Sequence, residues 1–106
     1  MKYFYVRQHG NSFIFDSFEN EQELLRGINK HHDVKCTSLD EVDNVIVNSC
    51  DWTELSTDLH ELAVIFNTFV EEEAENFEDA SDEDKALYIS EQKQNFVDFF
   101  NDGNER

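Results

Sequence analysis

The chain has 106 residues, of which 25 are Asp or Glu and 8 are Lys or Arg, so its formal net charge at pH 7 is −17. Hydrophobic residues make up 39% of the chain and include ten Phe, which is enough apolar mass for one core and argues against a disordered chain. The charge argues against direct binding to nucleic acid or to an anionic membrane, because phosphate groups would repel it.

The first elements predict a small sheet with a helix beside it. Aromatic and β-branched residues at 3–6 and 13–15 flank a Gly10-Asn11 pair, so residues 2–16 are expected to form a β-hairpin. A short helix follows, because Asn20 and Glu23 have the spacing of a capping box. The β-branched run Val45-Ile46-Val47 then predicts a third strand near 45–48.

Two longer helices are expected in the second half, over about 52–77 and 82–101. From Trp52 onward apolar residues recur at every third or fourth position, with no period-two component. Ser81 and Asp84 form a capping box for the last helix, and Gly103 is its expected stop. Together these elements predict one α+β domain over residues 1–106. It would combine a small antiparallel sheet (the hairpin plus a third strand), one short helix and two acidic C-terminal helices.

The charge is concentrated in the second half of the chain. Residues 1–39 contain five acidic and five basic residues, which cancel. Residues 40–106 contain twenty acidic residues and three basic ones, and therefore carry the whole −17. Residues 1–50 are expected to supply the sheet and short helix, and residues 51–106 an acidic helical half.

Acidic residues in the second half are spaced so that they share helix faces. At 100° per residue the first helix would align six of them within about 100° of arc, and the last helix would align three more, seven residues apart. The first row would span about 37 Å, close to the 34 Å of one DNA turn. The alternative is an acidic face that serves solubility alone. The predicted partner-binding residues are Glu54, Asp58, Glu61, Glu72, Glu75, Asp79, Asp84, Glu91 and Asp98.

By this charge pattern, residues 40–106 resemble the small acidic DNA-mimic proteins of phages, which block restriction, CRISPR or repair enzymes. No sequence motif carries the resemblance. It implies a protein-binding inhibitor that occupies the nucleic-acid groove of a basic partner, such as a nuclease or a defence complex. Two alternatives stay open: an immunity protein that neutralises a nuclease toxin, and a regulatory or adaptor subunit whose acidity is incidental.

Familiar catalytic motifs are absent from the sequence, and metal-binding motifs are incomplete. There is no phosphate-binding glycine loop, no GxSxG and no HExxH, so we expect neither an enzyme nor a bound cofactor. A calcium loop that starts at Asp79 lacks the required Gly at Asp84 and the required Glu at Ser90, which leaves only weak divalent binding over 79–84. His31, His32 and Cys36, with Cys50 or His60, have a spacing that could seed a zinc site, but no CxxC pair supports it.

The remaining expectations concern compartment and assembly. The first residues, from Met1 onward, have too short an apolar stretch for a secretory signal, and no apolar run reaches the length of a transmembrane helix. We therefore expect a cytoplasmic protein, in which Cys36 and Cys50 are reduced although they could pair. Val64, Ile65 and Leu87 lie off the predicted core faces, so they either contact the sheet or form an exposed apolar patch that would favour a homodimer or a partner contact.

Overall fold

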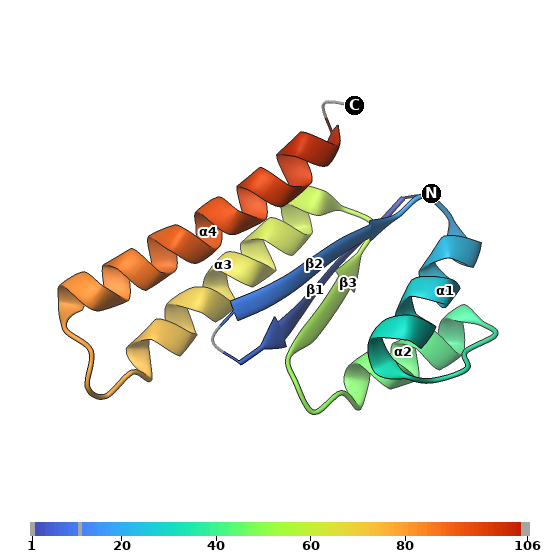
Figure 1. Cartoon of the computed structure of the whole chain (residues 1–106), viewed down its shortest axis with the longest axis horizontal. Helices are drawn as coiled ribbons and strands as arrows, with labels where there is room; N and C mark the ends of the chain where they lie inside the picture. The colour runs from blue at the N-terminus through green and yellow to red at the C-terminus, as the bar shows by residue number, and fades with distance from the viewer. Residues whose placement is uncertain (1, 11, 105–106) are drawn as a thin grey trace. The chain divides into compact units, whose positions relative to one another are not determined.

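The computed structural model describes residues 2–10 and 12–104, with side chains as far as Phe100. The chain divides into two compact units, Met1–Leu59 and His60–Arg106 (Figure 1). The first unit contains β1 (Tyr3–His9), β2 (Ser12–Phe18), α1 (Glu21–His32), α2 (Leu39–Val47) and β3 (Thr53–Ser56). α3 (Leu59–Glu75) and α4 (Asp82–Asn104) make up the second. The α+β fold with a three-stranded antiparallel sheet is confirmed, and the prediction of a single domain stays a prediction.

The sheet has the order β2-β1-β3, with both pairings antiparallel. Gly10 closes the predicted hairpin with a φ of 63°, in the left-handed region that glycine enters without steric cost. β2 runs two residues past the predicted end of the hairpin, to Phe18. β1 is the central strand, so both of its edges find hydrogen-bonding partners.

One face of this sheet packs against α1 and α2, which lie beside it in Figure 1. Side chains alternate along β1, so Tyr3, Tyr5 and Arg7 share that face. Tyr5 is fully buried there. The core cluster on this side consists of Tyr5, Phe18, Leu24, Ile28, Cys36 and Val42.

Both helices of this unit begin at a polar capping residue. The Asn20 side chain accepts a hydrogen bond from the backbone N–H of Glu23 at 2.9 Å, which confirms the predicted cap. The Glu23 carboxylate in turn accepts from the backbone N–H of Glu19 at 2.8 Å. Ser38 accepts from the backbone N–H of Glu41 at 3.4 Å. Ser38 therefore starts a nine-residue helix, α2.

The predicted position of the third strand was wrong. Residues 45–47 lie in α2, where Val45 and Ile46 pack beside the buried Val42 at helical spacing. The Ser38 cap and this burial outweigh the preference of β-branched residues for strands. The first unit therefore has two helices where one short helix was predicted.

The third strand lies instead inside the stretch predicted as the start of a long helix. Thr53–Ser56 pairs with β1, with Leu55 opposite Tyr5 and Thr53 opposite Arg7. This pairing satisfies the backbone groups on the second edge of β1, which would otherwise be left open. The prediction of a helix from residue 52 was therefore wrong as far as Asp58, and α3 begins at Leu59.

The second unit is an antiparallel pair of helices (Figure 1). Phe66 stacks on Phe96 with ring centroids 5.0 Å apart, and Phe77 meets Tyr88 edge to face at 4.8 Å. Two helices in this region are thus confirmed. Ser81 accepts from the backbone N–H of Asp84 at 3.2 Å, as the predicted capping box requires. α4 continues one residue past Gly103, its predicted stop.

Gly27 provides a test of packing in the first unit. A Cβ on this residue of α1 would overlap the ring of Phe18, which is only 5% exposed and has little room to move. Alanine raises helix propensity by about 1 kcal/mol, but we expect Gly27→Ala to lower the free energy of unfolding by about 1–3 kcal/mol, because overpacking dominates. Urea denaturation measures this, with the exposed Gln22→Ala in the same helix as the neutral control. A Gly27→Ala variant as stable as the wild type would contradict the close approach.

Candidate functional site

The predicted partner-binding residues lie on several elements. Glu54 is on β3, Asp58 precedes α3, and Asp79 is in the loop between α3 and α4. The prediction of one six-residue stripe on a single helix was therefore wrong. The residues that do lie on the two long helices are Glu61, Glu72 and Glu75 on α3, and Asp84, Glu91 and Asp98 on α4.

Glu54 differs from the others in its surroundings. It lies on β3 opposite Val6, which is fully buried, and its own side chain is half-buried. Burial raises the pKa of the Glu54 carboxyl because the charged form loses hydration. Its position makes it the least suited of the nine to act as a fixed surface charge.

The helical carboxylates form two rows, which we call the α3 row (Glu61, Glu72, Glu75) and the α4 row (Asp84, Glu91, Asp98). All six side chains are exposed. At 100° per residue the α3 row occupies about 60° of arc and the α4 row about 40°. Each row lies on the side of its helix away from the buried residues, and each covers about 21 Å of helix axis. The buried residues are Leu62, Phe66, Val70 and Ala74 on α3, and Gln92, Phe96 and Phe100 on α4.

Few positive charges oppose these rows within their own unit. His60–Arg106 contains fourteen Asp or Glu and three Lys or Arg, a net charge of −11. Lys93 is bound to Glu71 at 2.9 Å. Between residues 60 and 100 every acidic side chain is exposed except the half-buried Glu73. The charge is therefore held at the surface, where a partner can reach it.

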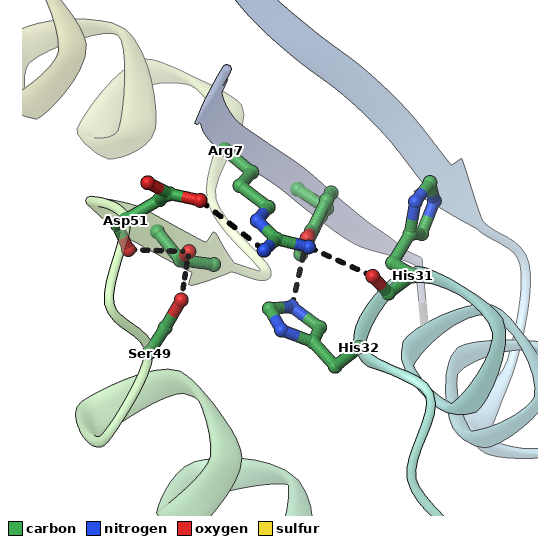
Figure 2. Close-up of polar contacts among 7 residues, drawn as sticks. Arg7, His31, His32, Ser49 and Asp51 are labelled. Carbon is green, nitrogen blue, oxygen red and sulfur yellow. Dashed lines mark hydrogen bonds and ion pairs between the residues drawn. The ribbon is translucent and has the colours of Figure 1, made fainter. Parts of the chain in front are cut away.

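A second feature, in the first unit, is a hollow of about 560 Å³ around Arg7, which we call the Arg7 hollow. Arg7 donates from Nη1 to the backbone oxygen of His31 at 2.7 Å, and its Nη2 lies 3.3 Å from a carboxylate oxygen of Asp51 (Figure 2). Its Nε is buried and has no hydrogen-bond partner. The hollow is lined by Arg7, His31, His32, Asp33, Val34, Asn44, Val45, Asn48, Ser49 and Cys50.

Tyr5 and the two histidines are linked beside Arg7. The Tyr5 hydroxyl lies 2.9 Å from His32 Nε2, and its ring stacks on His31 at 5.0 Å. His31 Nε2 is in turn 3.0 Å from a carboxylate oxygen of Asp16. Burial raises the pKa of Tyr5 to about 12, and burial together with the Arg7 charge lowers the pKa of His32. The hydrogen bond between Tyr5 and His32 thus joins two groups that the fold favours in their neutral forms.

Neither feature gathers a set of metal ligands. Among the residues that the structure describes, no three His, Cys, Asp or Glu side chains are placed to hold a metal ion. His31 and His32 contact Asp16 and Tyr5, while Cys36 is in the core. Cys36 and Cys50 are both free thiols, the first buried and the second exposed. The loop at 79–84 likewise lacks such a group.

The sequence did not predict the cluster around Arg7. The sequence singled out His31 and His32 only as candidate zinc ligands, whereas in the structure they contact Asp16 and Tyr5. The sequence does contain an indication of the cluster. Arg7 lies two residues after Tyr5 in an aromatic strand, so its positive charge is placed on the same, buried face of the sheet.

No helix in the part of the chain that the structure describes is both long and apolar enough to cross a membrane. No protein-family model, curated protein or solved structure matches this chain. Its functional interpretation rests on its own residues.

Proposed function

We propose that this protein is a cytoplasmic, acidic inhibitor that binds another protein. It presents a surface resembling nucleic acid to the basic groove of that partner. The partner is a nucleic-acid-binding protein, such as a nuclease or a restriction or CRISPR defence complex, so that the inhibitor has an anti-restriction or anti-CRISPR role. The observation that carries the proposal is the exposure of nearly every carboxylate between residues 60 and 100 in a unit with only three basic residues.

The charge density of this unit supports the comparison with nucleic acid. α4 has 23 residues, which corresponds to about 34 Å of axis. A net charge of −11 over that length is one negative charge per roughly 3 Å, against about 3.4 Å per charge for each strand of a DNA duplex. Solubility alone requires a net charge of only about 2–8 for a small domain. The net charge of the unit therefore exceeds what solubility needs, and its charge spacing is close to that of one DNA strand.

The Arg7 hollow is less suited to be the inhibitory surface. Arg7 is already engaged by Asp51 and by the His31 carbonyl, and the −17 charge of the chain would weaken the binding of an anionic ligand. We assign this cluster to holding α1 and the loop before β3 against the sheet.

The test is competition with nucleic acid. The partner is first recovered from bacterial lysate with the immobilised protein and loaded with a fluorescently labelled DNA duplex, and the protein is then titrated in. We expect the duplex to be displaced, because both ligands use the same basic groove. A ternary complex that retains the duplex would contradict mimicry.

The salt dependence of association is measured in the same system. Attraction between exposed charges is screened as the Debye length falls below about 10 Å at 0.1 M salt. We expect the association rate to fall at least tenfold between roughly 50 mM and 500 mM salt, as for other electrostatically steered pairs. A flat profile would indicate a mainly apolar interface.

A further inference from the structure

α4 also carries an apolar hollow, distinct in its residues from the two carboxylate rows. It has a volume of about 470 Å³ and is lined by Ala86, Ile89, Ser90, Lys93, Gln94 and Val97, and we call it the α4 hollow. Ala86, Ile89, Lys93 and Val97 follow one another at helical spacing, so they form a strip along one side of α4 about 16 Å long. Val97 keeps 43% of its surface exposed. An apolar strip on a strongly acidic surface is unfavourable in water unless something covers it.

The contacts at the two edges of the hollow place carboxylates there. On one edge Lys93 binds Glu71 of α3 at 2.9 Å, so the one cation that lines the hollow is neutralised. On the other edge Gln94 donates to a carboxylate oxygen of Asp98 at 2.7 Å. Asp82 and Glu83 lie on the same side of α4 one turn before Ala86, at 100° per residue. The apolar floor is therefore bordered by negative charge along the Asp98 edge and at the Asp82–Glu83 end, and by a neutral ion pair along the other edge.

We propose that the α4 hollow is the docking site for an amphipathic, Lys- and Arg-rich helix of the protein partner, and this proposal rests on the proposed function. Apolar side chains of that helix cover Ile89 and Val97, while its basic residues meet Asp98 on one edge and Asp82 or Glu83 at the end of the strip. The backbone of α4 is already hydrogen-bonded within the helix, so a partner cannot add to it as a strand does to a sheet edge and must bind through side chains. A strip of about 16 Å is long enough for the i, i+3, i+4 and i+7 anchors of helix-in-groove recognition, which span about 11 Å of helix.

The test uses two synthetic peptides of one composition. The first is a helix of about 18 residues, five turns, with Leu along one face and Lys elsewhere. The second has the same residues in scrambled order. Binding to the whole protein is measured by fluorescence anisotropy, and amide shifts locate the contact. We expect the amphipathic peptide to bind more tightly, with the largest shifts between Ala86 and Asp98.

Variants separate the hollow from the general charge. Val97→Gln should weaken binding of the amphipathic peptide about threefold to tenfold, as expected when half a valine side chain loses its apolar cover, and leave the scrambled peptide unchanged. Leu87→Gln is the matched control, because Leu87 is on the same helix, 58% exposed, and outside the hollow. It should change neither peptide. Circular dichroism checks that both variants remain helical.

The outcomes distinguish this inference from the function on which it rests. Equal, salt-sensitive binding of both peptides would overturn the docking site and leave the acidic inhibitor in place. Equal losses in Val97→Gln and Leu87→Gln would also overturn it, because the hollow would then have no special role. Binding of neither peptide would overturn both proposals.

Discussion

Neutralising four carboxylates of the α3 and α4 rows should slow association with the basic partner by tenfold or more at low salt. The variant combines Glu72→Gln, Glu75→Gln, Asp84→Asn and Glu91→Gln, all at exposed positions. A single exposed charge contributes at most about 1 kcal/mol, so each substitution alone should have a small effect. The four together remove a large part of a distributed field, and the loss should appear mainly in the association rate, measured by stopped-flow fluorescence.

The matched control removes four charges from the other unit. Glu19, Glu21, Asp40 and Asp43 are exposed, and their neutralisation leaves the same total charge. Asp16 and Glu23 are unsuitable for this purpose, because Asp16 contacts His31 and the Glu23 carboxylate accepts a hydrogen bond from the backbone N–H of Glu19. If both variants lose the same amount, the effect reflects total charge and the rows have no special role. An unaffected row variant would transfer the contact to another surface.

The parts of the fold that the sequence predicted are those fixed by local signals. The turn at Gly10 and the caps at Asn20 and Ser81 act within a few residues, and each occurs in the structure at the predicted position. The buried face of α3 from Leu62 onward was likewise predicted by the spacing of its apolar residues. Such signals need no knowledge of the rest of the chain.

The errors occur where pairing across the chain decides the structure. Thr53–Ser56 becomes a strand because β1 offers an open edge more than forty residues earlier in the sequence. Val45-Ile46-Val47 becomes helical because Val42 is drawn into the core under α1. A short apolar segment of this kind fits both the helical and the strand repeat of apolar residues. Its packing against the rest of the chain then selects one of the two structures.

The same distinction applies to the site. The carboxylates of α3 and α4 were predicted as rows because helical spacing is local, and those rows persist in the structure. Glu54 and Asp58 do not belong to these rows, because the residues before Leu59 that were predicted as helix are not helical in the structure. The α4 hollow could not be predicted, because its borders depend on the Lys93–Glu71 contact between two helices.

The pH dependence of stability should reveal the burial of the Tyr5 hydroxyl, which lies 2.9 Å from His32 Nε2. The pKa of Tyr5 is about 12 in the fold and 10.0 in the unfolded chain, so the fold favours the protonated phenol. The resulting stability is fully present below pH 10 and is lost as the pH rises from 10 to 12, up to about 2.7 kcal/mol at 1.36 kcal/mol per pKa unit. About half of it should be lost by pH 11.

Tyr5→Phe isolates this contribution, because phenylalanine keeps the ring packing and removes the titrating group. At about pH 8 the variant should be less stable than the wild type by roughly 1 kcal/mol, since His32 loses its partner. At about pH 11 the wild type should have lost about 1.4 kcal/mol that the variant does not lose, so the difference should close or reverse. Urea denaturation of both proteins at the two pH values measures it. Other titrating groups are common to the two proteins and cancel in the difference. A gap that stays constant from pH 8 to pH 11 would show that the Tyr5 hydroxyl is not held in a buried, neutral pair.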